Sequence, residues 1–519
     1  MKRSKFYLPT IICVSLLTIV FFFPACRNDK DPLPLVLADS TGIYDILDNT
    51  AKVTVSLMES VPGSVTRYGF VWGENTASPT ISDSKIEFNG ALPSPVRYTS
   101  LMQGLKKNTE YRLRAFVETD GTVIYGALRT FSTQPDYVKR LVQTLNDSLK
   151  GKGFGYSFIV TRKAEIVGEG FGGFQARSIE QGGERLVSLD SKMQVASMTK
   201  TITSVAFLKL AEEKGIPINT PIITYLPPSW TKGINTDRIT FGDLLKHRSG
   251  ITGFNEACQN GAFAENIYRG LKSLIQRGVR TDNIGKFCYQ NANFGMYRVL
   301  IPALLGYQFT GNDQVDDEAT RVMYENYIKE NVFAKLGVTS SEIFVNPSQS
   351  PVYGYDHPYT EGGIGYDAGD FTNTAGGYGL YLSAREAAKI YGGLFSTTDV
   401  SVLSAAMKDS VLTGGMASYS TITPQGKFFY HDGWWQFGLV TGKAKGFRSL
   451  WMKCPDDLTV VIFTNALRNG DGLFPIRSDF YSDITSYVLW AFSGINTNEN
   501  SRRSQPVNFH NYLQHPEPH

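Results

Sequence analysis

The chain has 519 residues, and its 51 basic and 48 acidic residues leave a formal net charge of only +3. A balance of this kind provides no basic patch, so a nucleic-acid partner is not expected. The six histidines show no spacing typical of metal ligands, so we expect neither a metal nor any other cofactor.

Residues 1–25 have the pattern of an export signal peptide. Three of the first five residues are basic, and an apolar run over residues 11–23 follows, too short for an ordinary membrane-spanning helix. Ala25 directly before Cys26 resembles a bacterial lipoprotein cleavage box. That resemblance implies a lipid on Cys26, which would anchor the exported protein to a membrane of the bacterial cell envelope, on a periplasmic or surface-facing side. Secretion after cleavage at Ala25 is the alternative.

A small all-β domain is expected after a tether. Residues 26–35 are charged and contain prolines, which suits a tether. Apolar and polar residues alternate over 53–57, the period of a half-buried strand, and residues 67–73 and 111–116 predict further strands. We therefore place a β-domain at residues 36–134.

This β-domain resembles the fibronectin type III-like domains. The resemblance rests on residues 105–111 and on the closing residues 131–133. It implies a β-sandwich of about 100 residues. We interpret the domain as a spacer, with carbohydrate binding as the alternative.

The segment 136–495 is long enough for one large domain with a sheet and a helical layer. Residues 156–161 and 165–168 predict a hairpin of that sheet. Residues 202–211 are apolar on nearly all sides, which is typical of a buried helix. The tail over 496–519 is polar and contains prolines, so we expect it to be disordered.

Ser197 and Lys200 lie at the predicted start of this buried helix. Residues three positions apart share one face of a helix, so the amine of Lys200 can reach the hydroxyl of Ser197. A serine hydroxyl is a weak nucleophile until a base takes its proton, and a desolvated lysine can serve as that base. The same spacing starts at Ser82 and at Ser229, where nothing else indicates chemistry.

Tyr289 and Asn291 form a second candidate pair. From an extended or turn segment, residues two positions apart point the same way. Tyr289 would move a proton between nucleophile and leaving group, and Asn291 would hold Lys200 or a substrate carbonyl. A second Tyr-x-Asn pair, at Tyr324, lies in a polar stretch that we expect to face solvent.

His431, Asp432 and Gly433 precede a run that predicts a strand edge, where glycine lets a substrate approach the backbone closely. Histidine is only partly charged near neutral pH, so His431 is a weak anchor for a substrate carboxylate. Asp432 either repels anionic substrates or points inward to a hydrogen-bonding partner. The tryptophans at 434–435 either line a substrate cleft or pack against the helical layer.

The order Ser-x-x-Lys, Tyr-x-Asn, His-x-Gly resembles that of the serine beta-lactamase and penicillin-binding-protein superfamily. It is most similar to the branch with class C beta-lactamases, D-Ala-D-Ala carboxypeptidases, D-aminopeptidases and related esterases. Residues 244–251, 374–386 and 440–466 resemble further stretches of that branch. The resemblance implies a mixed α/β (α+β) fold, with an antiparallel sheet between helical layers.

The resemblance also implies a role for each candidate residue. Ser197 would be the acylated nucleophile, Lys200 its proton acceptor and Tyr289 the second acid/base. Asn291 would brace the pocket. The backbone N–H groups of Ser197 and Trp434 would form the oxyanion hole.

The function implied is that of an exported serine hydrolase that cleaves a D-amino-acid peptide, amide or small ester through an acyl-enzyme. Its partners would then be small molecules or peptides, with peptidoglycan fragments among them. Because His431 stands where class C beta-lactamases have lysine, efficient beta-lactam cleavage is less expected. A non-catalytic relative that binds peptidoglycan fragments or beta-lactams as a sensor is the alternative.

Two further features stay open in the sequence. Cys258 and Cys288 pair in an oxidising compartment, or Cys288 packs as a small apolar residue. His247 invites a Ser-His-Asp interpretation, but residues 248–250 more readily predict a tight turn.

Overall fold

A computed structural model describes residues 37–57, 61, 63–258, 263–423, 426–437, 444–467 and 484–493. The chain divides into two compact units, one up to Pro135 and the other from Asp136. The predicted signal peptide at 1–25, the tether with Cys26 and the tail at 496–519 lie outside the described residues.

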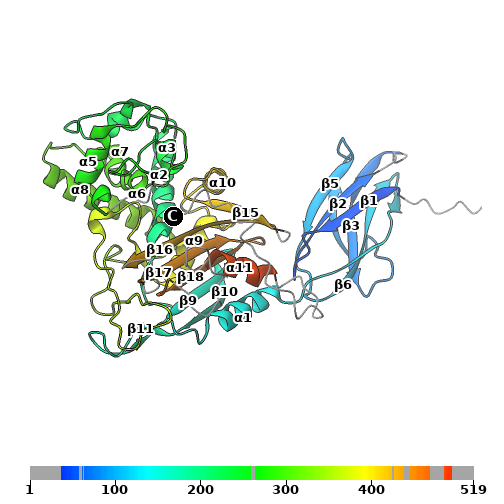
Figure 1. The fold of residues 1–519 in the computed structure, drawn as a ribbon. Helices are drawn as coiled ribbons and strands as arrows, with labels where there is room; N and C mark the ends of the chain where they lie inside the picture. Colours follow the sequence, from blue (N-terminus) through cyan, green and yellow to red (C-terminus); the bar gives the residue numbers. More distant parts are fainter. Residues whose placement is uncertain are drawn as a thin grey trace, which may run out of the picture. The chain divides into compact units, whose positions relative to one another are not determined.

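In the described part of the first unit, the regular elements are all strands (Figure 1). One sheet has the strand order β4-β3-β6-β7 with β8 paired to β6, and the other has the order β1-β2-β5. Apolar side chains such as Val53, Phe70 and Leu113 form the core of the unit. The strands are β1 Asp39–Tyr44, β2 Ala51–Leu57, β3 Val65–Glu74, β4 Ser84–Asn89, β5 Arg97–Met102, β6 Glu110–Thr119, β7 Thr122–Tyr125 and β8 Arg129–Ser132. The all-β prediction is confirmed, while the fibronectin type III-like assignment stays a prediction.

The second unit contains a six-stranded antiparallel sheet with the order β10-β9-β18-β17-β16-β15. Its first two strands are the predicted hairpin. The strands are β9 Tyr156–Arg162, β10 Glu165–Gly172, β15 Tyr419–Thr423, β16 Gly426–Phe437, β17 Lys445–Lys453 and β18 Leu458–Thr464. Two short pairs stand apart: β11 Phe174–Ala176 with β12 Arg185–Leu186, and β13 Met193–Gln194 with β14 Tyr381–Leu382.

The rest of the described part of this unit consists of helices, short helical turns and loops. Among the described residues, no helix is both long and apolar enough to cross a membrane. The α-helices are α1 Tyr137–Leu149, α2 Thr199–Lys214, α3 Phe241–Leu245, α4 Phe263–Asn266, α5 Tyr268–Arg277, α6 Asn291–Gly295, α7 Tyr297–Leu304, α8 Asp313–Ile328, α9 Ala384–Phe395, α10 Ala405–Thr413 and α11 Ile484–Ser493. The short turns are η1 Ala196–Met198, η2 Ile222–Tyr225, η3 Thr236–Arg238, η4 Lys329–Phe333, η5 Ala334–Leu336 and η6 Thr372–Thr374.

The sheet has a helical layer on each face, so the predicted fold class is confirmed (Figure 1). On one face, Trp451 of β17 stacks on Tyr391 of α9 with ring centroids 5.8 Å apart. On the other face lies α1, since a Cβ placed on Gly170 of β10 would meet both Asn146 of α1 and Phe158 of β9. Alternate residues of each strand therefore face different helical layers.

The helix α2 lies inside the second unit, as its all-round apolar pattern predicts. Nearly every residue from Thr199 to Ala211 is buried, including the polar Lys200. The helix ends at Gly215, which takes the left-handed conformation with φ +64° that closes helix C-termini without a Cβ penalty. The first turn of α2, and with it the candidate nucleophile, is thus held between the sheet and the other helices.

The prediction that Tyr324 faces solvent is wrong. Tyr324 lies in α8 and is fully buried, and its hydroxyl shares a hydrogen bond of 2.7 Å with Thr203 Oγ1. The buried stripe of α8 repeats every four residues through Asp316, Thr320 and Tyr324. Because two of these residues are polar, the stripe carries no hydrophobic signal in the sequence.

Candidate active site

Ser197 lies on the short turn η1, between the strand β13 and the buried helix α2. The preceding residue, Ala196, has φ +45°, a conformation that side chains with a Cβ rarely adopt. Its backbone N–H donates to Gln194 Oε1 at 2.8 Å. The turn holds Ser197 just ahead of the first turn of α2, where backbone N–H groups lack helical acceptors and the helix dipole is positive.

Lys200 is fully buried, and its amine contacts three oxygen atoms. Nζ lies 2.9 Å from Ser197 Oγ, 2.7 Å from Asn291 Oδ1 and 2.7 Å from the carbonyl oxygen of Gly377. Burial lowers the pKa of Lys200 well below the ordinary lysine value, and the Asp432 carboxylate offsets part of that effect. A neutral amine next to a hydroxyl is able to accept its proton.

Tyr289 brings a second titratable group to the nucleophile. Its hydroxyl lies 2.8 Å from Ser197 Oγ, and its ring lies 4.7 Å from Lys200 Nζ. Burial raises the pKa of Tyr289 well above the ordinary tyrosine value, the hydrogen bond with Ser197 opposes this rise, and Asp432 adds to it. The phenol therefore keeps its proton near neutral pH and is able to donate it.

Asn291 and Gly377 complete the surroundings of Lys200. Asn291 is the first residue of α6, and Gly377 precedes β14. A Cβ on Gly377 would lie only 2.7 Å from the backbone oxygen of Asn291, so glycine allows the two segments to close on the amine. The sequence does not mark Gly377 as a partner of Lys200, because every residue has a backbone carbonyl. The glycine-rich stretch at 374–386 is the one signal that points to this segment.

His431 is fully buried in β16. Its Nδ1 donates to the carbonyl oxygen of Asp432 at 2.6 Å, and its ring centroid lies 5.0 Å from that of Tyr419 in β15. Burial raises the pKa of Tyr419 well above the ordinary value, and nearby Tyr289 adds to the rise. Tyr419 thus lies within electrostatic range of Tyr289, although no motif in the sequence marks it.

Asp432 leaves β16 on the face opposite to His431 and Gly433, because neighbouring strand residues alternate. Its Oδ2 lies 3.1 Å from Nη1 of Arg448 on β17, and the two side chains are 1% and 3% exposed. The Asp432 side chain therefore points inward to a partner, which is one of the two expectations for this residue. The negative charge is paired with a buried guanidinium beneath the strand.

Gly433 is where β16 passes directly against the nucleophile turn. A Cβ at this position would lie 2.5 Å from the carbonyl oxygen of Val195, 2.7 Å from Ser449 Oγ and 2.9 Å from the backbone nitrogen of Ser197. Ser449 Oγ in turn donates to that carbonyl at 2.7 Å. The backbone of Trp434, the next residue, therefore follows the point of closest approach to Ser197.

The tryptophan pair divides between the two faces of β16. Trp435 stacks on Tyr378 at a centroid distance of 5.1 Å, and Phe371 meets the Trp435 ring edge-on at 4.9 Å. Both tryptophans are half-buried. Trp435 packs against aromatic residues of a loop and not against the helical layer, and a role of the pair in lining a substrate cleft stays a prediction.

The two other Ser-x-x-Lys matches lie on the surface. Ser82 and Lys85 are both exposed, and the lysine pairs with Glu87 at 3.5 Å. Ser229 is exposed, and Lys232 donates to the carbonyl oxygen of Pro227 at 2.5 Å. In neither pair is the lysine buried against its serine.

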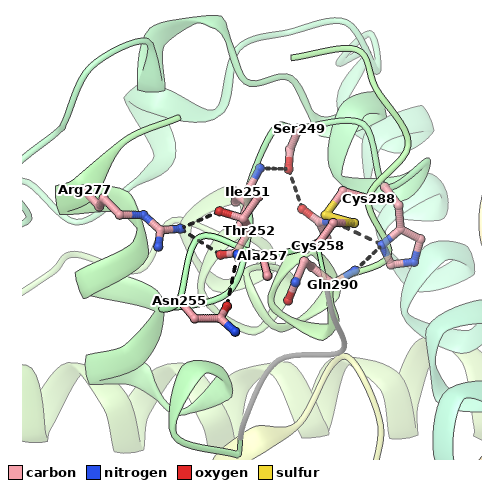
Figure 2. The surroundings of a disulfide bond; sticks show 11 residues. Ser249, Ile251, Thr252, Asn255, Ala257, Cys258, Arg277, Cys288 and Gln290 are labelled. Atoms are coloured by element: carbon pink, nitrogen blue, oxygen red, sulfur yellow. Dashed lines mark hydrogen bonds between the residues drawn. A yellow bond between two sulfur atoms is a disulfide. The ribbon is translucent and has the colours of Figure 1, made fainter. Parts of the chain in front are cut away.

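A disulfide joins Cys258 to Cys288, the residue directly before Tyr289. The sequence leaves this pairing open, and the structure has it (Figure 2). Figure 2 also shows Arg277 bonded to the backbone of the loop that carries Cys258, with a distance of 2.8 Å to the carbonyl oxygen of Thr252. The segment before Tyr289 is thus tied covalently to a loop that is itself anchored.

The sequence model of the family described as Beta-lactamase matches residues 138–477, well over half of the chain. The chain belongs to the beta-lactamase family. A Bacillus subtilis protein described as a penicillin-binding protein, PbpX, is 25% identical over 347 residues, which are 65% of this chain and 77% of that relative. The predicted membership of the beta-lactamase and penicillin-binding-protein superfamily is confirmed.

Solved structures with this fold include FmtA of Staphylococcus aureus, with a TM-score of 0.51 and 15% identity over 70% of this chain and 91% of that one. A beta-lactamase/D-alanine carboxypeptidase of Yersinia pestis has a TM-score of 0.50 and 15% identity over 70% and 98%. At this identity the two structures share the fold alone. The fold is that of a serine hydrolase superfamily.

Gly433→Ala tests the close approach of β16 to η1 in this beta-lactamase family member. The new Cβ meets backbone atoms that cannot move aside freely, so we expect a destabilisation of about 1–3 kcal/mol. We also expect reaction of Ser197 with a fluorophosphonate to slow about tenfold or more, because a small displacement of the nucleophile is costly. Differential scanning calorimetry and labelling rates measure the two effects.

Gly42→Ala is the matched control, because nothing lies within 4 Å of a Cβ placed there. It should change neither value. An unchanged labelling rate in Gly433→Ala would show that this glycine does not position the nucleophile.

Proposed function

We propose that this protein is an exported serine hydrolase that forms an acyl-enzyme on Ser197 and cleaves a D-amino-acid peptide, an amide or a small ester. One observation carries the proposal: Lys200 Nζ and Tyr289 Oη lie 2.9 and 2.8 Å from Ser197 Oγ. The lysine is desolvated, so its amine is a base. Burial keeps the phenol of Tyr289 protonated, so it holds a proton that it can donate.

In the proposed reaction, Lys200 accepts the Ser197 proton while Oγ attacks the substrate carbonyl carbon. The electrons of the C=O bond move to oxygen, where the backbone N–H groups of Ser197 and Trp434 would stabilise the charge. The bond to the leaving group then breaks, and Tyr289 donates the proton that this group needs. Water attacks the acyl carbon next and gives one proton to the Lys200–Tyr289 pair. The bond between the acyl carbon and Oγ then breaks, and the pair returns a proton to Oγ.

Substrates without a carboxylate beside the scissile bond suit the site best. His431 is buried and donates to the carbonyl oxygen of Asp432, and the Arg448 guanidinium is paired with the Asp432 carboxylate. Neither of these groups offers a free permanent positive charge to an anionic substrate. Peptidoglycan fragments and small esters stay in the proposal, and efficient beta-lactam cleavage is less favoured.

The competing function is a sensor that binds peptidoglycan fragments or beta-lactams without turnover. Binding alone does not require an amine and a phenol that both contact one hydroxyl. The geometry around Ser197 therefore favours catalysis over sensing. An adduct on Ser197 that is never released would favour the sensor.

Exposure of the protein from Asp31 onward to a fluorophosphonate should add one probe mass to the intact protein. Ser197→Ala should lose the adduct and the hydrolysis of activated esters. Ser82→Ala and Ser229→Ala are matched controls from the two other Ser-x-x-Lys sites and should keep both. Turnover by Ser197→Ala at the wild-type rate would exclude the mechanism.

The acylation rate should rise with pH, because the neutral form of Lys200 is the active one. Its half-maximum should lie well below 10.5, the ordinary lysine value. In Lys200→Arg the guanidinium stays protonated throughout, so the rate should be low at every pH. The same rise of rate with pH in Lys200→Arg, or a half-maximum at or above the ordinary lysine value, would show that another group is the base.

The same pKa shift affects stability. Between the folded and the unfolded pKa of Lys200, the unfolded chain binds the additional proton. The free energy of unfolding should therefore rise with pH across that window. Below the window both states carry the proton, so the contribution of Lys200 stays at its low value.

Export and anchoring follow from residues 1–26 in this proposal, with a lipid on Cys26. Cells fed a labelled fatty acid should label the wild-type protein and the control Cys13→Ala, whose changed residue leaves with the signal peptide. Cys26→Ala should stay unlabelled. A labelled Cys26→Ala protein would move the anchor elsewhere.

A further inference from the structure

His247 lies beside the candidate catalytic group, in a segment that the reaction scheme does not use. It follows α3 and takes φ +54°, in the left-handed region. The residue is 3% exposed. Such backbone conformations persist where the surrounding structure holds them, and they cluster at functional sites.

The imidazole of His247 packs against the ring of Tyr289. The ring centroids are 4.3 Å apart with an interplanar angle of 28°. The ring of Phe294, in α6, lies 5.1 Å from the imidazole and is tilted to it by 49°. The phenol of Tyr289 is therefore set against a flat surface that fixes the plane of its ring.

The hydrogen bonds of His247 define its protonation state. Nδ1 accepts from the backbone N–H of Gln290 at 3.2 Å and from Asn293 Nδ2 at 3.1 Å. The Asn293 amide is oriented by Ser249, whose Oγ donates to Oδ1 at 2.6 Å. Because both neighbours of Nδ1 are donors, this nitrogen carries no proton. These contacts place the hydrogen of the imidazole on Nε2.

The backbone of His247 supports the same segment. Its carbonyl oxygen accepts from the N–H of Cys288 at 2.7 Å. Residues 287–290 belong to no helix or strand, so no regular ladder holds them. His247 thus contacts three consecutive residues around the phenol: Cys288 through its carbonyl, Tyr289 through its ring and Gln290 through Nδ1.

We propose that His247 is a positioning residue, which holds the Tyr289 hydroxyl at hydrogen-bond distance from Ser197. It does not touch the reacting atoms, and it acts through Tyr289 alone. This inference rests on the proposed function, since it assigns a support to that reaction's acid. The disulfide at Cys288 (Figure 2) ties the same segment by a different route and serves as a comparison.

A double-mutant cycle tests the proposal with one activated ester as substrate. His247→Ala should lower kcat about tenfold or more and leave KM within about twofold, because the displaced phenol acts in chemistry and not in binding. On a Tyr289→Phe background the same change should cost nothing further, since residues that act through one group are not additive. His247→Asn tolerates the left-handed backbone and keeps an acceptor for Gln290, so it should restore part of the loss.

His357→Asn is the matched control: it changes another buried histidine, which packs edge-on against Phe154 at 5.3 Å. It should leave kcat unchanged on both backgrounds. If His247→Ala does not fold, the cycle with His247→Asn carries the test. Removing the disulfide in Cys258→Ser/Cys288→Ser should lower kcat less than His247→Ala does.

Two results would overturn the proposal. One is a folded His247→Ala protein with the wild-type kcat, and the other is an equal loss on both backgrounds, which indicates general destabilisation. Failure of the proposed function has a different signature. In that case wild-type protein forms no adduct on Ser197, whatever residue stands at position 247.

Discussion

Burial of the Lys200 amine is the constraint on which the rest of the site depends. A cation taken out of water is costly unless it loses its proton or finds oxygen partners, and Lys200 has partners from three separate segments. The nucleophile turn, the start of α6 and the loop before β14 must all meet at one atom. The candidate site therefore exists only where these three segments of the second unit are packed together.

Close backbone contacts follow from this requirement. Gly377 and Gly433 both lie where a Cβ would overlap the backbone of another segment, and both adjoin the atoms around Ser197. The helix α2 is apolar on nearly all sides because it is enclosed by these segments. Several polar residues at its N-terminal end form hydrogen bonds with other segments, as Thr203 does with Tyr324.

Sequence analysis finds the residues whose side chains are chemically specific. Ser197, Lys200, Tyr289 and Asn291 are brought together as the order of their motifs predicts, and the buried helix follows from its apolar pattern. The ion pair of Asp432 with Arg448 is not predictable from the sequence, because it depends on the pairing register of β16 and β17. Every residue type has a backbone carbonyl, so the sequence cannot mark that of Gly377. The buried stripe of α8 is hard to find because it includes the polar Asp316 and Thr320. His247 looks in the sequence like a candidate base, and its true neighbours appear only when residues 247 and 289 meet in space.

The alternation of β16 between two helical layers has a consequence for how this fold tolerates change. His431 and Gly433 face the nucleophile, while the Asp432 carboxylate is paired beneath the strand with Arg448. Inserting or deleting one residue in the strand would exchange the two sets, placing a carboxylate against Ser197 and a histidine under the sheet. Length changes around this strand are therefore acceptable in pairs of residues or in the loops at its ends. Substitutions within β16 keep this alternation, whereas a single insertion inside the strand reverses it beyond the point of insertion.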